Sequence, residues 1–284
     1  MFSLLIFYLK NFYFAPAKIH NYWLLSMAII TFMSDYGTKD HYVAAVKAKI
    51  LSINPSINIV DISHNIKPYD IAHASYVLKS VFRDFPKGTV HLYAVDTIGQ
   101  KGSRYICAKL EDHFFVGNDN GLCSLISEKE PDMISELFSA KQDGKTFPAK
   151  DVLAKAAAMI ASGSNMNDVG KFTKDVERKV ARKFRATKKQ ISGNVIHIDH
   201  YGNLVTNIEE EVFQIISKNR KYTVQFAREK LTEINGLCNE AEDGDCFVIF
   251  NSNGYLEIGI NKGNASELLG LKYDSPVNIF FEGE

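Results

Sequence analysis

ITFMSDYGTKDHYVAAVKAKI, residues 30–50, decides the fold of the first half of the chain. The apolar run over residues 28–34 is typical of a buried strand, and it stops at Asp35. Residues 42–51 then carry apolar side chains at helical spacing. A strand, a polar turn and a helix in succession predict an α/β unit, and such units bind ligands at the carboxyl ends of their strands. Asp35 is therefore expected at a ligand-binding edge.

The same alternation continues to about residue 170. We expect strands over residues 57–62, 89–95, 105–110 and 114–116, and helices over 71–82 and 149–161. Strands that alternate with helices predict a mainly parallel, Rossmann-like sheet. From residue 192 onward, short strands divided by Gly and Asn turns predict an all-β barrel.

The domains are therefore predicted at residues 27–170 and 192–284, joined by a basic linker over 171–191. Residues 171–190 hold nine Lys or Arg against two acids. Such a run could grip a polyanion, but no aromatic stacking set accompanies it, so we interpret it as a solvated connection. The whole chain of 284 residues has 33 Lys+Arg and 33 Asp+Glu, and this balance does not favour a nucleic-acid partner.

The four cysteines form no CxxC pair and have no zinc spacing, so we expect no metal site and a reducing, cytoplasmic location. Residues 1–26 need a separate explanation. Their apolar run from Phe2 to Leu9 is too short to span a bilayer, and Met27 opens the first predicted strand. We favour a mis-called start or an extension for residues 1–26, with a signal peptide or membrane anchor as the alternatives. We expect no membrane partner.

Single residues at the predicted turns could carry chemistry. The carboxylate of Asp35 could accept two hydrogen bonds from a ribose diol, or simply cap a turn or helix. Asp96 follows the third strand, and Arg104 lies eight residues later across a loop. This pair could orient a water molecule or form an ordinary surface ion pair. No Walker loop, GxGxxG, HExxH or GxSxG motif is present.

Turn residues of the second half leave similar alternatives. Asp199 and Asn203 interrupt a β run, and an asparagine side chain suits the edge of a purine as well as a hairpin turn. Ser252 and Asn264 lie in further turns with the same ambiguity. In the first half, Tyr69 could stack on a base or pack in the core.

Taken in order, six stretches resemble the S-adenosylmethionine hydroxide adenosyltransferases, a family related to fluorinating and chlorinating enzymes. The stretches are FMSDYGTKDHYVAAVKAKI, IVDISHNIKPYDIAHASYVL, FPKGTVHLYAVD, FFVGNDNGLCSL, VIHIDHYGNLVTNI and NSNGYLEIGINKGNAS. They cover nearly the whole chain from Met27 onward. The resemblance implies an α/β domain and a β-barrel, assembled as a homotrimer. Each site would lie between the N-terminal domain of one subunit and the C-terminal domain of its neighbour.

The resemblance also implies roles for single residues. Asp35 would hold the ribose hydroxyls of S-adenosylmethionine, and Tyr69 would line the pocket. Asp199 and Asn203 would hold the methionine part and the adenine. The remaining implied contacts are Ser252 at the methionine end, and Asn264 and Ala265 beside the adenine.

The implied reaction is attack of water or hydroxide on the ribose 5′ carbon, which releases methionine and forms adenosine. The leaving group is a neutral thioether, so no general acid is needed, and the enzyme must align and desolvate the nucleophile. Asp96 and Arg104 would place the water. No metal or other cofactor is expected, and S-adenosylmethionine is the small-molecule substrate.

Two positions depart from the hydrolytic members of the family. Their segment TFHGRD reads TFPAKD here, so Pro148 stands in place of a histidine, and Ser103 stands in place of the first of two arginines. His64 and His113 are possible substitutes for that histidine. The alternative hypothesis is a protein that binds S-adenosylmethionine or adenosine and hydrolyses it very slowly or not at all.

Halogenation is disfavoured on two grounds. The halogenating relatives carry an inserted loop, and no long insertion fits between Arg104 and Phe115. Their tyrosine on the third strand corresponds to Asp96, whose carboxylate would repel a halide.

Overall fold

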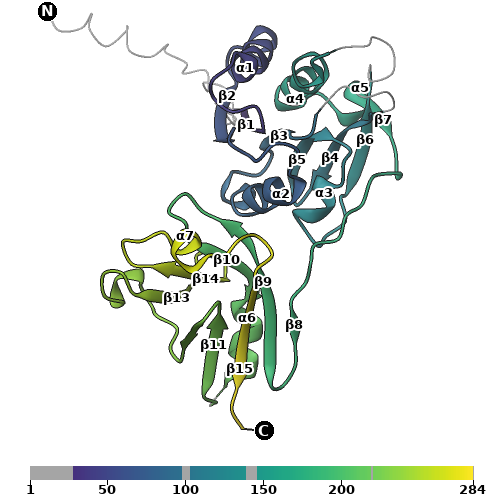
Figure 1. Ribbon diagram of the computed structural model, residues 1–284. Helices are drawn as coiled ribbons and strands as arrows, with labels where there is room; N and C mark the ends of the chain where they lie inside the picture. Colours follow the sequence, from purple (N-terminus) through teal and green to yellow (C-terminus); the bar gives the residue numbers. More distant parts are fainter. Residues whose placement is uncertain (1–27, 98–102, 139–145, 219, 284) are drawn as a thin grey trace, which may run out of the picture.

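The computed structural model describes residues 28–97, 103–138, 146–218 and 220–283, which form two packed units (Figure 1). The first unit contains a seven-stranded sheet in the order β2-β1-β3-β5-β4-β6-β7. Its strands are β1 (Ile29–Ser34), β2 (Asn58–Ser63), β3 (Val90–Ala94), β4 (Tyr105–Leu110), β5 (His113–Asn118), β6 (Met133–Leu137) and β7 (Gly170–Phe172).

Helices cover both faces of this sheet (Figure 1). Alternate residues of a strand face opposite sides, so Ile30 and Phe32 of β1 belong to one apolar core and Met33 to the other. The helices are α1 (Tyr42–Ile53), α2 (Ile71–Lys79), α3 (Leu122–Leu125), α4 (Ala154–Ala161) and α5 (Met166–Val169), with a 3-10 turn over Phe82–Asp84 and a π turn over Ala149–Leu153. The part of the chain that the structure describes contains no helix with the length and apolar character needed to cross a bilayer.

The sheet is mixed, which corrects the expectation of a mainly parallel one. β2, β1, β3 and β5 pair in parallel, but β4 pairs antiparallel with β5 and with β6, and β6 pairs antiparallel with β7. Glu111 and Asp112, with φ of 50° and 63°, form the two-residue turn between β4 and β5. A turn this short can only join antiparallel strands, and both of its residues have positive φ, as such a hairpin requires. Neither residue is glycine or asparagine, so the sequence offers little indication of a hairpin turn here.

The second unit is one antiparallel, barrel-like sheet in the order β12-β11-β15-β9-β10-β14-β13, with β8 beside β9. Its apolar core is separate from the two cores of the first unit. The strands are β8 (Arg185–Ala186), β9 (Gln190–Ile198), β10 (Leu204–Glu209), β11 (Tyr222–Phe226), β12 (Glu229–Leu231), β13 (Cys246–Phe250), β14 (Tyr255–Ile260) and β15 (Pro276–Phe281). The helical segments are α6 (Glu210–Ser217), α7 (Ala265–Leu269) and a 3-10 turn over Cys238–Glu240.

Helix α2 packs against the second unit. The ring of Tyr76 stacks on His197 of β9 with centroids 4.4 Å apart, and the ammonium of Lys79 donates to the hydroxyl of Tyr255 at 3.0 Å. The connecting chain between β7 and β9 lies over residues 173–189 and contains β8. The main-chain carbonyl of Arg182 accepts a hydrogen bond from Asn207 Nδ2, and the Arg182 side chain forms an ion pair with Asp274. The connection is therefore attached to the barrel as well.

A chain of polar side chains crosses the interior of the first sheet. Thr31 Oγ1 lies 2.8 Å from His91 Nδ1, and His91 Nε2 lies 3.2 Å from His113 Nδ1. His91 is fully buried beside the rings of Phe82 and Phe115. Burial, followed by the neighbouring His113, lowers the pKa of His91 from 6.5 to about 3.

This burial makes stability depend on pH. The unfolded chain binds a proton at His91 near pH 6.5, whereas the folded chain does so only near pH 3, so the free energy of unfolding falls as the pH drops between these values. We expect His91→Gln to reduce the slope of unfolding free energy against pH by up to about 1.4 kcal/mol per unit between pH 6 and 4. Urea unfolding at several pH values measures the slope. The exposed His200, changed to Gln, should leave the slope unaltered, and an equal slope in the His91 variant would contradict the prediction.

Candidate functional site

Asp35 joins the carboxyl ends of the first three parallel strands. It follows β1, and its Oδ2 accepts hydrogen bonds from the main-chain N–H of Tyr69, at 3.0 Å, and of Asp96, at 3.1 Å. Tyr69 lies in the loop after β2, and Asp96 comes directly after β3. Because β2 and β3 flank β1 in parallel, their ends meet at one edge of the sheet. The structure therefore brings together three of the predicted site residues.

The two main-chain donors have an unusual conformation. Tyr69 has φ of 65° and Asp96 has φ of 53°, both in the left-handed region. This conformation costs a non-glycine residue about 1–2 kcal/mol. Hydrogen bonds to a charged acceptor are among the stronger ones, so the Asp35 carboxylate offsets this cost. The Tyr69 ring is 62% exposed, which leaves its faces available to a ligand.

His64 holds the turn that contains Asp35. Its Nδ1 lies 2.8 Å from Ser34 Oγ, its Nε2 lies 3.1 Å from Asp61 Oδ1, and its carbonyl accepts from the N–H of Gly37 at 2.8 Å. His64 is buried, with Nδ1 bonded to Ser34 and Nε2 facing the Asp61 carboxylate, so its ring supports the turn. His113 lies at the amino end of β5, whereas Asp96 follows the carboxyl end of the parallel β3. Position alone therefore makes His113 unsuitable as a replacement for the missing histidine.

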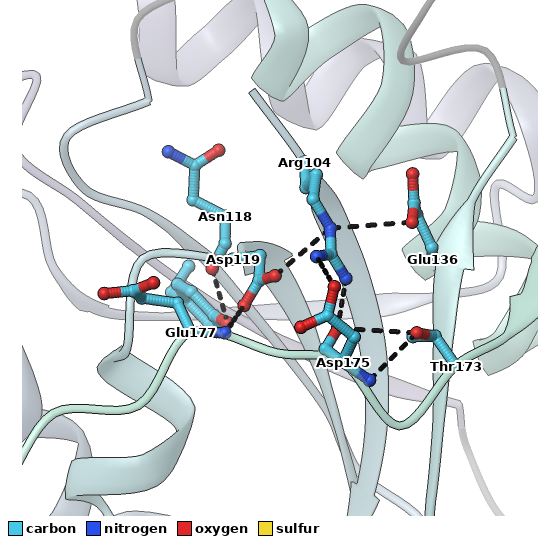
Figure 2. A network of polar contacts seen from close by, with 8 residues as sticks. Arg104, Asn118, Asp119, Glu136, Thr173, Asp175 and Glu177 are labelled. Atoms are coloured by element: carbon cyan, nitrogen blue, oxygen red, sulfur yellow. Dashed lines mark hydrogen bonds and ion pairs between the residues drawn. The ribbon is translucent and has the colours of Figure 1, made fainter. Parts of the chain in front are cut away.

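Arg104 lies among carboxylates (Figure 2). Its Nη1 donates to Asp175 Oδ2 at 2.8 Å, its Nη2 donates to the Asp175 carbonyl, and its Nε lies 3.4 Å from Asp119 Oδ2 and 3.5 Å from Glu136 Oε2. Its ion-pair partners within the described residues are thus these three acids. Asp119 is buried, which raises the pKa of its carboxyl, while the charge of Arg104 opposes that rise. This geometry ties β4 to β5, β6 and the connecting chain, and the predicted pairing of Arg104 with Asp96 stays a prediction.

The segment that replaces the histidine lies beside the Asp35 turn. The ring of Phe147 packs against Tyr36 and Tyr42, with centroids 5.9 and 5.5 Å apart. Burial and the charge of Asp35 raise the pKa of Tyr36, so its phenol stays protonated. Pro148 is buried at the start of the π turn and its side chain carries no donor or acceptor. A substitute for the histidine must therefore come from another element.

In the second unit, Asp199 organises the turn between β9 and β10. Its Oδ1 accepts from the N–H of Tyr201 and of Asn203, at 2.9 and 2.8 Å, and its Oδ2 accepts from Asn203 Nδ2 at 3.1 Å. Gly202 has φ of 86°, and a Cβ there would lie 2.0 Å from Asn264 Oδ1, so only glycine allows this close approach.

Asn203 and Asn264 line a hollow of about 440 Å³ at this end of the barrel. The other lining residues are Tyr201, Cys238, Phe247, Ile260, Asn261, Lys262 and Gly263. Asn264 Oδ1 also accepts from the N–H of Glu267 and so caps α7. Ala265 is fully buried in the barrel core and is not among the residues that line the hollow. The predicted asparagines are thus gathered here, and Asn261 is a lining residue that sequence reasoning missed.

Glu257 is another residue that sequence reasoning missed. Its Oε2 accepts from Asn251 Nδ2 at 3.0 Å, and Asn251 begins the exposed turn that contains Ser252. Burial, together with the nearby charge of Asp199, raises the pKa of Glu257. The sequence feature that could have pointed to Glu257 is a single carboxylate inside the otherwise apolar strand YLEIGI. Asn251 and Glu257 thus connect the β13–β14 turn, which contains Ser252, to the Asp199 turn.

A larger hollow of about 830 Å³ lies between α2, the connecting chain and the barrel. Tyr69 is the one predicted site residue among those that border it; Tyr76, Tyr255 and Tyr273 border it as well. Within the described residues, no group of three or more His, Cys, Asp or Glu side chains could hold a metal ion.

Comparison with known proteins follows this division into two units. The family model of the SAM hydroxide adenosyltransferase N-terminal domain matches residues 30–170, and that of the C-terminal domain matches residues 193–278. An (R)-S-adenosyl-L-methionine hydrolase of Methanocaldococcus jannaschii is 31% identical and covers 89% of this chain and 96% of its own length. A fluorinase of an Actinoplanes species is 25% identical, covering 88% of this chain and 97% of its own length. A crystal structure of an uncharacterized conserved protein from Thermotoga maritima superimposes with a TM-score of 0.81 at 31% identity, covering 88% of this chain and 99% of that one.

Fold and site together define a two-domain protein in which an α/β sheet presents its carboxyl edge and a β-barrel presents a hollow lined with asparagine side chains. The chain belongs to the SAM hydroxide adenosyltransferase family, since the two family models cover most of its length.

The contacts of Arg104 predict a stabilising role. Arg104→Gln would leave the Asp119 carboxylate, whose side chain is 3% exposed, without its cation, and we expect it to lower the free energy of unfolding by about 2–4 kcal/mol. Arg178 pairs with Glu130 through side chains that are 62% and 70% exposed, so Arg178→Gln should cost less than about 1 kcal/mol. Urea unfolding compares the two variants. Equal unfolding free energies in the two variants would show that the Arg104 ion pairs contribute little to stability. A loss of turnover without a loss of stability would support a role for Arg104 beside the reacting atoms.

Proposed function

We propose that this protein hydrolyses S-adenosylmethionine to adenosine and methionine. The observation that carries the proposal is the Asp35 carboxylate, which holds the carboxyl ends of three parallel strands together in a chain that belongs to this family. The hydrolase name of the relatives from M. jannaschii and Thermus thermophilus, at 31% and 30% identity, supports the same reaction.

The arrangement of Asp35 suggests how the nucleoside is held. Its Oδ2 already accepts two main-chain hydrogen bonds, so we assign Oδ1 to the ribose hydroxyls. The exposed ring of Tyr69 would pack against the ligand from the neighbouring loop. In the barrel, Asn203 and Asn264 would bind the adenine from the hollow that they line. Ala265, which follows Asn264, would support this segment from the core.

Two carboxylates of the barrel suit the rest of the ligand. Asp199 lies close enough to the half-buried Glu257 for its charge to raise the pKa of Glu257, after burial, which is the larger cause. A cation between them would relieve this repulsion. S-adenosylmethionine carries an ammonium and a sulfonium, and we assign its methionine part to Asp199 with Ser252 at the far end.

The chemistry requires one nucleophile and no acid. The oxygen of water attacks the ribose 5′ carbon, the bond from that carbon to sulfur breaks, and its electron pair stays on sulfur, which leaves as the neutral thioether of methionine. The water loses one proton to Asp96 and then to solvent. The protein contributes alignment of water opposite sulfur and exclusion of other solvent. We propose that no metal or further cofactor takes part.

A second candidate function rests on Pro148. A protein that binds S-adenosylmethionine or adenosine without turnover would need the same binding residues but no group in place of the histidine. The free thiols Cys107, Cys123, Cys238 and Cys246 fit a reducing cytoplasm for either function.

The division of the site residues supports a site shared between subunits. Asp35, Tyr69 and Asp96 form one group, and Asp199, Asn203 and Asn264 form the other; within the described residues no hydrogen bond or ion pair links the two. The packing between the units uses α2, β9 and β14 instead. We propose a homotrimer in which the first group of one subunit meets the second group of its neighbour.

Hydrolysis is tested by incubation with S-adenosylmethionine in oxygen-18 water. We expect labelled adenosine and methionine, and we expect Asp96→Asn to lower kcat by a factor of about 100 or more with Kd little changed, because general-base groups typically contribute at least that much. The exposed Asp112, changed to Asn, is the matched control and should retain full turnover. Binding without labelled product would favour the second candidate function, and full turnover in Asp96→Asn would remove Asp96 from the mechanism.

The shared site is tested by complementation. Asp96→Asn disables the first group and Asn203→Ala the second, so each variant alone should be inactive. If sites form between subunits, a co-expressed equimolar mixture pairs two intact halves at about one site in four and recovers that share of activity. A site contained within one chain predicts no recovery, and this result would refute the shared site.

A further inference from the structure

Asn118 contacts the loop that presents Asp96. It ends β5, which pairs in parallel with β3, and its Nδ2 donates to the Asp96 carbonyl at 2.7 Å. Asn118 is 7% exposed. Its main-chain carbonyl accepts from the hydroxyl of Tyr93 at 3.1 Å, which holds the strand end in place. The side chain is therefore well ordered at the carboxyl edge of the sheet.

The contact with Asp96 decides how the carboxamide is oriented. A carbonyl oxygen can only accept, so the NH₂ group of Asn118 must face it, and a rotated amide would set two oxygens against each other. Oδ1 then points away from Asp96's carbonyl. Asp119, the next residue, belongs to the ion-pair network of Arg104, but the carboxamide of Asn118 points away from that network (Figure 2).

Oδ1 of Asn118 has no hydrogen-bond donor within the described part of the chain, although the atom is buried. Such an acceptor costs about 1–3 kcal/mol when it stays unpaired, so buried acceptors are nearly always paired with protein, water or ligand. The atom is therefore suited to accept a hydrogen bond from a small donor at this edge.

Asn120 supports the loop at Val95 and Asp96 with both ends of its carboxamide hydrogen-bonded. Its Nδ2 donates to the Val95 carbonyl at 3.1 Å, one residue before Asp96, and its Oδ1 accepts from the N–H of Leu122 at 3.3 Å. Asn118 and Asn120 thus support the same loop through the same kind of bond. They differ in that Oδ1 of Asn118 has no hydrogen-bond donor among the described residues.

We propose that Asn118 Oδ1 accepts a hydrogen bond from the attacking water and so performs the positioning that the histidine absent at Pro148 cannot. The proposal rests on the proposed hydrolysis. One O–H of the water donates to Asn118 and the other to Asp96, which aims a lone pair at the ribose 5′ carbon. An amide oxygen is not a base at neutral pH, so the proton released on attack goes to Asp96, and Asn118 contributes orientation only.

The test compares Asn118→Leu with Asn120→Leu. Each removes one side-chain hydrogen bond to this loop, and Asn120→Leu also removes the bond to Leu122, so we expect the melting temperature of Asn120→Leu to fall at least as far. Asn118→Leu should lower kcat about 100-fold while Kd for S-adenosylmethionine, measured by calorimetry, changes less than about threefold, as for loss of a group that acts on the reacting atoms. Asn120→Leu should leave kcat within about threefold of the wild type.

Asn118→Gln is the second variant, because it keeps both the donor and the acceptor of the carboxamide. It covers the case in which Asn118→Leu fails to fold, and its kcat should stay within about tenfold of the wild type. Equal losses of kcat in the two leucine variants, or full turnover in Asn118→Leu, would overturn the role of Asn118 and leave the hydrolysis standing. A wild-type protein that binds S-adenosylmethionine without turnover would overturn both.

Discussion

The structure depends on one carboxylate oxygen. Oδ2 of Asp35 accepts hydrogen bonds from the N–H groups of Tyr69 and Asp96. These bonds hold the two residues in the left-handed region of backbone conformation at the edge of the sheet. His64 supports the turn from below through Ser34 and Gly37. An aspartate that was expected to bind ribose is thus also a structural centre, since the side chain that we assign to the ligand shapes the loops around it.

The polar residues around this edge fall into two kinds. Arg104 is held by Asp119, Glu136 and Asp175, which ties four segments of the chain together (Figure 2). Asn118 uses one half of its carboxamide for structure and leaves the other half unpaired beside Asp96. Satisfied polar groups give rigidity, whereas an unsatisfied buried acceptor is costly and is commonly retained where a water or ligand completes it. This difference separates the supporting arginine from the asparagine that we assign to the water.

The barrel contributes a second, separate set of groups. Asp199 organises its own turn, and Gly202 allows Asn264 to approach closely enough to complete the hollow. Glu257 adds a second carboxylate whose pKa is raised by burial and by Asp199. In the proposed assignment the barrel supplies the amide contacts and the negative charge, whereas the first unit supplies Asp35 for the ribose and Asp96 for the water, so neither unit holds the complete site.

The sequence by itself determined the two units, most element positions and the place of Asp35, because strand and helix periodicity and turn residues are local properties. It also determined the family, through six ordered stretches. Only the tertiary structure decided the reversal at Glu111 and Asp112, the carboxylate partners of Arg104, the buried side chain of Ala265 and the unpaired oxygen of Asn118. The partners of Arg104 and the unpaired oxygen of Asn118 depend on which polar groups distant in sequence come within bonding range. The burial of Ala265 depends on how the barrel packs, and the turn at Glu111 and Asp112 lacks the glycine or asparagine that would have indicated it.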